Sequence, residues 1–327
     1  MILGSCHWYG YLNDPNVIVN EEDPYLYIPT GSNFDTVVNR LERKGVLKNI
    51  EGFVWVAKRK SYPESVKPGR YKLINGMTNN ALVNLLKSGR QTPVNVSFHY
   101  VRTIPQLAAK IARKIEADSS SLVQAMCNPG ILSQHVLNEE TCELLYIPNT
   151  YEFYWNTSAD AFVQRMAKEY QTFWNEERKQ KAAAISLTPS QVGILASLVM
   201  AEQSVHKSEW KRIAGLYINR LNKGMLLQCD PTVIYAHGDQ PIQRVLLRHL
   251  EIDSPYNTYK YPGLPPGPIM IPEPDALDAV LNYEKHDFIY MCAKEDFSGL
   301  HNFASTLKEH QQNARRYQKA LNQAGIR

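Results

Sequence analysis

The segment from Thr188 to Glu202 constrains the fold most, because it predicts a helix whose apolar side must be buried. Thr188 suits the position that caps a helix, Pro189 the first helical position, and Gln191 the third, where its side chain can bond back to the cap. Apolar side chains then recur on one face, at Val192, Leu195, Ala196 and Val199. At about 100° per residue, Glu202 falls on the same face. The pattern therefore predicts a carboxylate beside the core.

Glu202 is the first candidate functional residue. A carboxylate on an apolar helix face is rarely buried without a partner, and loss of solvation raises its pKa. A carboxyl group that stays protonated near neutral pH can serve as a general acid. The structural alternative is an ion pair with Arg212 or another cation, or an interface position at the helix end. The pattern by itself leaves both interpretations open.

The residues after Glu202 predict a second amphipathic helix and a turn. The helix covers about residues 208–221 and ends at Gly224, and residues 225–228 are typical of a short strand. Asp230 precedes a proline, which favours a turn, and its side chain can cap the helix that follows. Capping is the structural alternative to a functional role for this carboxylate.

A segment rich in proline and glycine comes next. Residues 254–269 predict a rigid, non-helical loop, which is either an ordinary structural loop or a sugar-binding one. Its tyrosines and Asn257 suit sugars, because aromatic faces stack on pyranose rings and amides bond to hydroxyl groups. Residues 288–293 predict a buried strand, and a C-terminal helix carries His310. The spacing of His301, His310 and Asp230 matches no recognised metal signature.

The first half of the chain alternates short strands and helices. Residues 25–29 predict a strand, and a helix from Phe34 ends at Gly45. A turn at residues 67–69 leads into another strand, and Thr78 can cap a helix that closes at Gly89. Further on, we expect strands or extended segments at residues 94–101 and 146–154, and helices at residues 105–117, 119–126 and 159–184.

Composition is ordinary for a folded soluble protein and excludes several classes. The chain has 327 residues, 44% hydrophobic and 21% charged, with a net charge of +4 and no long run of like charges. The sequence has no basic stripe of the kind that would indicate a nucleic-acid partner. The five cysteines lack a CxxC pair, which argues against a zinc site or a disulfide framework. The sequence contains no run of about 18 apolar residues, so it predicts no membrane span.

A resemblance appears when the motifs are taken together. Residues 190–320 resemble, in order and with natural spacing, the catalytic domain of the endolytic murein transglycosylases, the YceG-like family. The resemblance is carried by residues 196–202, 218–221, 224–235, 256–259, 263–269 and 301–303. Residues 67–71 resemble a K-x-G-x-Y stretch of the family's LysM-like domain. Residues 146–151 resemble its aromatic P-D-T-Y segment, although Asn149 stands where Asp is usual.

The resemblance implies an α+β fold, with a small LysM-like module and a mixed α/β catalytic domain that is not lysozyme-like all-α. The expected parts are a leader or linker at residues 1–24 that follows a missing membrane anchor, the LysM-like module at 25–92, connecting strand and helices at 93–185, and the catalytic domain at 186–327. It also implies a single N-terminal anchor in the inner membrane, with the catalytic part in the periplasm, and cell-wall synthesis proteins as partners.

The family's catalytic Glu corresponds to Glu202, and Met200 stands where many members have a second acid. The motifs suggest substrate contacts from Gln228, Asp230, Tyr235, Asn257, Tyr259, Leu264, Pro265, His301 and Phe303. The implied reaction is cleavage of the MurNAc–GlcNAc bond in peptidoglycan by an acid/base that needs no metal or organic cofactor. The 6-hydroxyl of MurNAc is the nucleophile, and 1,6-anhydroMurNAc ends are the product.

Two alternatives from other classes remain. The chain is also compatible with a non-catalytic protein that binds peptidoglycan. A hydrolytic muramidase would need two carboxyl groups, and Asp230 or Glu209 would then be the second acid. The mass of the products separates these interpretations, because hydrolysis adds water and transglycosylation does not.

Overall fold

The computed structural model describes residues 9–238, 242 and 245–325 of the chain, which group into two compact units. The first unit comprises residues up to Ser97 together with Ala108–Leu122 and Thr150–Ala161. The second unit comprises Phe98–Leu107, Val123–Asn149 and the residues from Phe162 onward. The described residues form helices and small two-stranded sheets, so the predicted mixed α+β class is confirmed and an all-α fold is excluded. The expected connecting section at residues 93–185 is divided between the two units.

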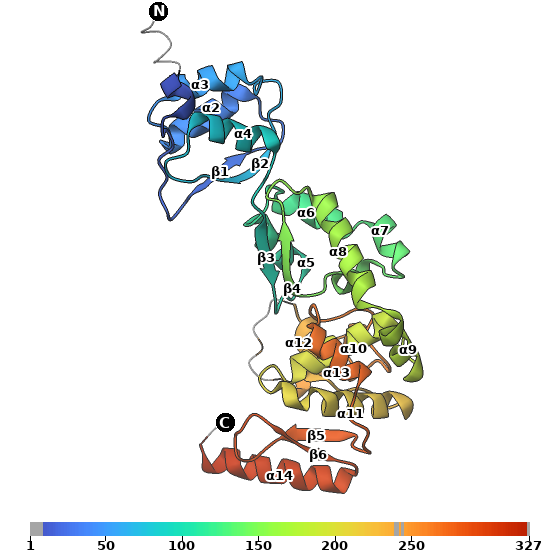
Figure 1. Cartoon of the computed structure of the whole chain (residues 1–327). Coiled ribbons are helices and arrows are strands. Elements are labelled where there is room, and N and C mark those ends of the chain that lie inside the picture. Colours follow the sequence, from blue (N-terminus) through green and yellow to red (C-terminus); the bar gives the residue numbers. More distant parts are fainter. Residues whose placement is uncertain (1–8, 239–241, 243–244, 326–327) are drawn as a thin grey trace, which may run out of the picture. The chain divides into compact units, whose positions relative to one another are not determined.

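The first unit is built on one antiparallel strand pair. β1 (Tyr25–Ile28) pairs with β2 (Gly69–Lys72), and Figure 1 shows α2 (Phe34–Lys44), α3 (Ile50–Arg59) and α4 (Asn79–Ser88) lying together on one side of the pair. The predicted helix ends are confirmed. Gly45 and Gly89 close α2 and α4 in the left-handed conformation, and the Thr78 side chain caps α4. Helix α3 was missing from the prediction, although its core residues Phe53, Val56 and Ala57 have helical spacing.

The boundary expected at residue 24 is wrong. Val17 is 1% exposed and belongs to the same core as β1 and α2. The preceding Asn16 is also buried, because its amide donates to Asn79 Oδ1 at 2.6 Å and to the Asn49 carbonyl at 2.8 Å. These contacts satisfy the buried polar groups of Asn16, so the segment around Asn16 and Val17 is part of the unit and not a linker.

The middle of the chain contributes short elements to both units. They are β3 (Val94–Phe98), α5 (Ile104–Ala112), α6 (Ser119–Met126), α7 (Pro129–Gln134), the 3₁₀ helix η1 (Glu139–Leu145), β4 (Asn149–Phe153), α8 (Ala159–Phe173) and α9 (Glu176–Ala184). The single helix predicted over residues 159–184 is wrong. It breaks at Asn175, whose side chain accepts from the Arg178 amide and starts α9 as a new helix.

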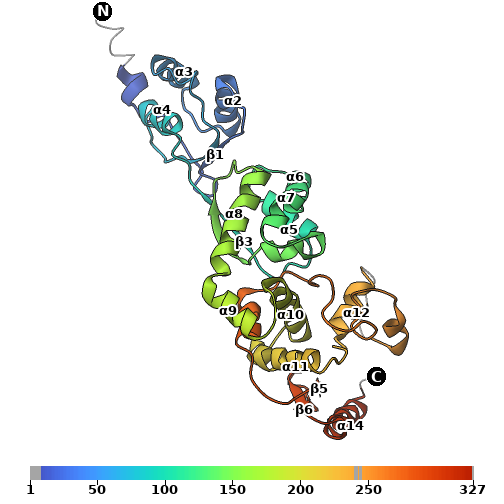
Figure 2. The ribbon, with the colours of Figure 1, turned by 90° about the vertical axis from the view of Figure 1, so that its right-hand side faces the viewer.

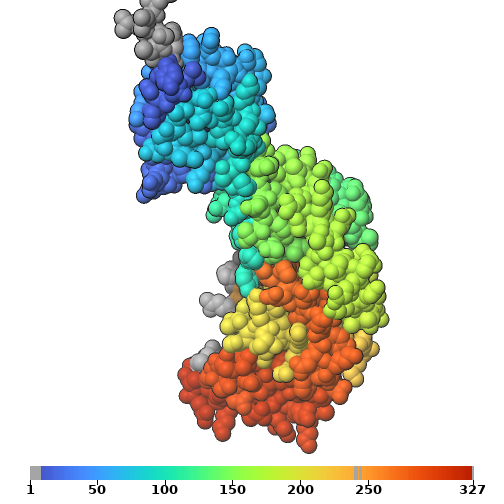
Figure 3. Space-filling view, in the orientation of Figure 1, coloured from blue at the N-terminus to red at the C-terminus, as the bar shows by residue number. Residues whose placement is uncertain are grey.

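The second unit continues with α10 (Pro189–Glu202), which is its central helix. Thr188 and Gln191 form the predicted capping box. The helix is buried on all sides from Val192 to Met200, and not along one face, because η1, α11 (Trp210–Asn222), α12 (Asp230–Ala236) and α13 (Pro274–Leu281) all contact it. The yellow-to-red residues of this unit present one continuous surface in the view of Figure 3.

The C-terminal part of the second unit is a strand pair and a helix. β5 (Tyr290–Ala293) pairs with β6 (His301–Ala304), and α14 (Leu307–Gln323) packs on both strands, as Figures 1 and 2 show. The 3₁₀ helices η2 (Lys207–Glu209) and η3 (Leu247–Glu251) complete the unit. The short strand predicted at residues 225–228 is wrong, since this segment is irregular and Gln228 has a φ of 52°.

No single helix among the described residues has the length and apolar character to cross a membrane. Helices α9 and α10 meet the criterion only as a pair bent by 76°.

Candidate active site

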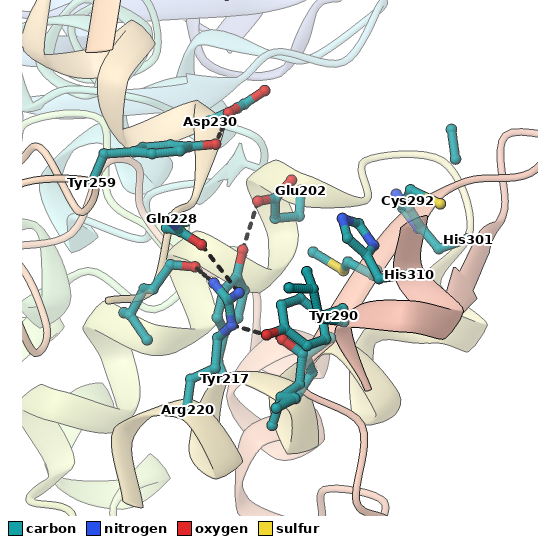
Figure 4. A pocket seen from close by; sticks show the side chains of 16 residues that line it. Glu202, Tyr217, Arg220, Gln228, Asp230, Tyr259, Tyr290, Cys292, His301 and His310 are labelled. Carbon is teal, nitrogen blue, oxygen red and sulfur yellow. Dashed lines mark hydrogen bonds between the residues drawn. The ribbon is translucent and has the colours of Figure 1, made fainter. Parts of the chain in front are cut away.

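A pocket of about 400 Å³ lies entirely within the second unit, with Glu202 in its lining. The lining comes from α10, α11, the segment before α12, the start of α12, the loop that carries Tyr259, β5, β6 and α14. In Figure 4, Glu202 lies between Asp230 and Tyr259 on one side and His301, His310 and Cys292 on the other. The pocket therefore gathers side chains that are up to about a hundred residues apart in sequence around one carboxyl group.

Glu202 is the last residue of α10 and is half-buried, with part of its surface facing the pocket. Its Oε1 accepts a hydrogen bond of 2.6 Å from the hydroxyl of Tyr217 (Figure 4). Burial raises the pKa of Glu202, and the nearby Asp230 carboxylate adds to this, whereas hydrogen bonds from Tyr217 and Cys229 and the charge of His301 oppose it. The net result is a carboxyl group that holds its proton at a higher pH than an exposed Glu does.

The two donors to Glu202 are themselves buried. Tyr217 is 1% exposed and Cys229 is fully buried, and burial raises the pKa of both groups well above their ordinary values. Both therefore keep their protons and act as donors. The tyrosine comes from α11 and the cysteine immediately precedes α12, so two separate elements fix the orientation of the Glu202 carboxyl.

The ion pair that was the structural alternative for Glu202 is not formed with Arg212. The Arg212 guanidinium contacts Glu284 instead, at 3.1 Å. Among the ion pairs within the part of the chain that the structure describes, none involves Glu202. The carboxyl group is thus placed in the pocket without a neutralising cation bonded to it.

Asp230 presents a second carboxyl group to the same pocket. It is the first residue of α12, and the cap position belongs to Cys229, so the predicted capping role is wrong. Its Oδ1 accepts a hydrogen bond of 2.5 Å from the hydroxyl of Tyr259. Burial and this carboxylate raise the pKa of Tyr259, which therefore stays protonated as the donor.

Arg220 shapes the wall of the pocket between α11 and α12. The residue is 6% exposed, and its guanidinium donates to four neutral oxygens. These are the carbonyls of Ile289 at 2.7 Å, Leu226 at 3.1 Å and Leu227 at 2.7 Å, and Gln228 Oε1 at 3.2 Å. The segment at residues 225–228 is irregular and has no β-sheet hydrogen bonds of its own. Arg220 therefore holds it in the conformation that presents Gln228 to the pocket (Figure 4).

A second hydrogen-bonded network places His301. Its Nδ1 lies 2.8 Å from Glu209 Oε2, and its backbone N–H donates to Glu209 Oε1 at 3.0 Å. Gln203 also donates to Glu209, at 2.9 Å. Burial pushes the pKa of Glu209 up, but the hydrogen bonds from His301 and Gln203 outweigh it and the pKa is lowered. Glu209 is thus an ionised group committed to orienting His301, and it does not line the pocket.

The structure brings together five of the ten site residues expected from the sequence. Glu202, Gln228, Asp230, Tyr259 and His301 all line the pocket. It adds residues that the sequence analysis missed, of which Tyr217 and Arg220 make the closest polar contacts. Their spacing of three residues on α11, one helical turn apart, was the available signal that they share a face.

The other five expected residues lie outside this pocket. Tyr235 packs on Tyr256, with ring centroids 4.7 Å apart, and Phe303 packs on Phe288 at 5.8 Å. Asn257 is 0% exposed, and its amide donates to the carbonyls of Leu250 and Ile252, so it shapes the loop from inside. Leu264 and Pro265 line a different hollow, together with residues of α10 and α11.

Within the described ranges 9–238, 242 and 245–325, no group of three or more His, Cys, Asp or Glu side chains has a geometry that could hold a metal ion. His310 instead stacks on Tyr290, with centroids 5.1 Å apart, and burial lowers its pKa.

The hydrogen bond from Tyr217 predicts a change in the titration of Glu202. In Tyr217→Phe the ionised carboxylate loses a donor, so the pKa of Glu202 is expected to rise further above its ordinary range. The measurement is a pH titration of the side-chain carboxyl resonances by ¹³C NMR. Tyr261→Phe is the matched control, because Tyr261 donates to the remote Asp253 carboxylate at 2.7 Å. A Glu202 titration that stays in place or moves down in Tyr217→Phe contradicts the assignment.

Comparison with known proteins places the chain among relatives of known type. The sequence profile of the YceG-like family matches residues 26–316. An endolytic murein transglycosylase of Bacillus subtilis (strain 168) is 30% identical over 347 aligned residues, covering 99% of this chain and 93% of the relative. An endolytic murein transglycosylase of Streptococcus pneumoniae is 28% identical, covering 88% of this chain and 57% of the relative.

A solved structure agrees. The crystal structure of a yceG-like protein from Listeria monocytogenes superposes with a TM-score of 0.58 at 28% sequence identity, covering 88% of this chain and 97% of that one. The profile match covers most of the chain and includes both units. The chain therefore belongs to the YceG-like family.

Proposed function

We propose that this protein is an endolytic lytic transglycosylase that cleaves MurNAc–GlcNAc bonds in peptidoglycan glycan strands. Relatives that match across most of the chain carry the name endolytic murein transglycosylase. The observation that carries the proposal is Glu202, a carboxyl group with a raised pKa, oriented by two donors and facing a pocket. A group of this kind is what a single-residue acid/base mechanism requires.

The reaction needs two proton transfers at Glu202 and no water. Protonated Glu202 donates to the glycosidic oxygen as the bond from C1 of MurNAc breaks, which releases the GlcNAc-terminated strand. The carboxylate so formed takes the proton from the MurNAc 6-hydroxyl as its oxygen attacks C1 of the same sugar. The product end is 1,6-anhydroMurNAc, and Glu202 is protonated again. Tyr217 holds the carboxyl orientation through both steps.

The hydrolytic alternative rests on Asp230, which faces the same pocket and offers a second carboxyl group. Mass spectrometry of soluble products from purified sacculi separates the two reactions. Transglycosylation gives anhydro ends, whereas a muramidase gives reducing ends whose mass is greater by one water. We expect anhydro products from the native protein and from Asp230→Asn. Reducing ends would establish the muramidase reaction, and absence of any release would establish a binding protein.

We further propose that the first unit is a LysM-like module that binds the glycan. Its β1–α2–α3–β2 order, with the two strands paired antiparallel, supports this proposal. A groove of about 530 Å³ runs between β1 and α2 and combines aromatic, amide and basic side chains. Its polar and aromatic lining residues are Tyr25, Tyr27, Thr36, Asn39, Arg40, Arg43 and Lys44. Such a lining suits sugar rings that carry carboxylate-bearing peptides.

Reversing the charge of this groove is expected to weaken wall binding. In Arg40→Glu/Arg43→Glu, two cations that face the groove become anions, so the dissociation constant for sacculi at low salt, measured by co-sedimentation over a range of sacculus concentrations, is expected to rise by about 10-fold, which corresponds to a loss near 1.4 kcal/mol. Lys58→Glu/Arg90→Glu changes the same charge at exposed positions outside the groove and serves as the control. Equal losses in both variants would reduce the effect to overall charge.

We also propose that the protein acts outside the cytoplasm, at the periplasmic face of the inner membrane, near the proteins that synthesise the wall. The support is the location of the proposed substrate together with the family resemblance. A fusion of alkaline phosphatase to the C-terminus of the native gene product tests this, because that enzyme is active only after export. An inactive fusion at normal protein levels would place the catalytic part inside.

A further inference from the structure

Two cysteines of the second unit lie against each other, away from the pocket that holds Glu202. Cys127 follows α6, and Cys142 lies within η1. Their sulfur atoms are 3.8 Å apart, which is sulfur–sulfur contact between two thiols. Side-chain rotation over less than two ångströms would bring them to disulfide distance, about 2.05 Å. The scattered spacing of the cysteines in the sequence gave no sign of this pair.

The two thiols differ in access, as a reactive pair requires. Cys127 is half-buried and reachable from solvent, whereas Cys142 is 3% exposed. The Cys142 thiol is within donor reach of the Cys127 sulfur, and this hydrogen bond lowers the pKa of Cys127. Of the two thiols, the one that solvent reaches and whose pKa is lowered is the better placed to attack an external disulfide.

A carboxyl group stands beside the buried thiol. Cys142 Sγ lies 3.5 Å from Glu143 Oε2, and burial raises the pKa of Glu143. A carboxylate with a raised pKa is a better proton acceptor than an exposed one. Glu143 is therefore placed to take the proton of Cys142 when that sulfur becomes the second nucleophile.

We propose that Cys127 and Cys142 form a reversible disulfide, with Cys127 as the attacking thiol, Cys142 as the resolving thiol and a low-molecular-weight disulfide as the oxidant. The Cys127 thiolate attacks one sulfur of the oxidant, which forms a mixed disulfide and releases one small thiol. Cys142 then transfers its proton to Glu143 and attacks the Cys127 sulfur, which releases the second small thiol. Two protein thiols are oxidised and one external disulfide is reduced to two thiols.

The bond would brace the helix that carries Glu202. It links the end of α6 to η1 and closes a loop that contains α7. η1 packs closely on α10, since a Cβ added at Gly193 would lie 2.7 Å from Leu144 Cδ2. Closing a loop of about 15 residues stabilises a fold by restricting the unfolded chain, so oxidation is expected to raise the Tm by roughly 5–10 °C.

The test uses the full chain, reduced and then treated with glutathione disulfide under native conditions. Free thiols are blocked with N-ethylmaleimide, and peptides are mapped by mass spectrometry. We expect a linked pair of peptides that contain Cys127 and Cys142, and a higher Tm that reverts with dithiothreitol. Cys142→Ser should retain glutathione on Cys127, because the resolving thiol is gone. Cys127→Ser should leave Cys142 unmodified, because it is buried.

Cys292 is the internal control, since it is half-buried and has no cysteine partner among the described residues. It is expected to carry at most a glutathione adduct. A native protein in which Cys127 keeps glutathione while Cys142 remains free overturns the proposal. A linked peptide pair without a rise in Tm overturns the bracing role, while the Cys127–Cys142 disulfide itself is established. Neither outcome depends on transglycosylase activity, so the test is separate from that of the proposed function.

Discussion

Glu202→Gln is expected to reduce the release of anhydro-muropeptides from purified sacculi by about 10³-fold or more. General acid–base catalysis by a positioned group contributes about 10²–10⁴-fold, and this mechanism uses the same carboxyl group as acid and then as base. Glutamine keeps the size of the side chain and an oxygen that can accept from Tyr217. The loss therefore reports the missing proton transfers and not a collapsed pocket. The measurement is product release quantified by mass spectrometry over time.

The same variant provides its own test of folding. Because burial raises the pKa of Glu202 above its ordinary value of 4.5, the folded protein binds more protons than the unfolded chain between 4.5 and the raised pKa. Stability contributed by this group is thus present at low pH and falls as the pH rises through that window. Glu202→Gln lacks this titration. The Tm of the variant minus the Tm of the native protein should therefore increase as the pH is raised toward neutral. Release at the native rate, from a variant with this Tm profile, would end the catalytic assignment.

Arg220→Met is expected to lower the free energy of unfolding by about 3 kcal/mol or more. The change removes the donor from the buried carbonyl of Leu227 and from the part-buried carbonyls of Leu226 and Ile289, and each buried group left unpaired costs about 1–3 kcal/mol. Relief from burying a cation offsets part of this cost, since burial already lowers the pKa of Arg220. Thermal unfolding followed by circular dichroism should show a Tm lower by roughly 6–12 °C.

The control for this variant lies on the same helix. Arg212→Met removes an arginine whose side chain is 43% exposed and which contacts a similarly exposed Glu284, so the expected loss is under about 1 kcal/mol. Arg220→Lys should recover little stability, because an ammonium group cannot reach the same set of oxygens in the fixed geometry of a guanidinium. If Arg220→Met and Arg212→Met lose equal stability, Arg220 does not hold the segment before α12.

Local chemistry in the sequence determined the ends of the helices. The capping box at Thr188 and Gln191 and the left-handed glycines Gly45 and Gly89 act over three or four residues, so their patterns can be read without a structure. The same holds for the break at Asn175, an N-cap signal that was present but overlooked inside a long polar helix. Motif order across the last third also indicated the family, which the profile match confirms.

The tertiary structure decided which side chains reach the pocket. Tyr217, Arg220 and His301 come from α11 and β6, and no spacing relates them to Glu202. Asn257 illustrates the opposite outcome, because its amide is taken by two carbonyls of its own loop.

The physical reason for this difference is the distance along the sequence over which each interaction acts. Capping and turn preferences are local free energies. The pKa of Glu202 instead depends on its burial and on groups from other elements, which are Tyr217 of α11, Cys229 before α12, Asp230 of α12 and His301 of β6. The sequence by itself placed a carboxyl group at the end of an apolar helix. Only packing of distant segments around that group determined its orientation, its protonation and its neighbours.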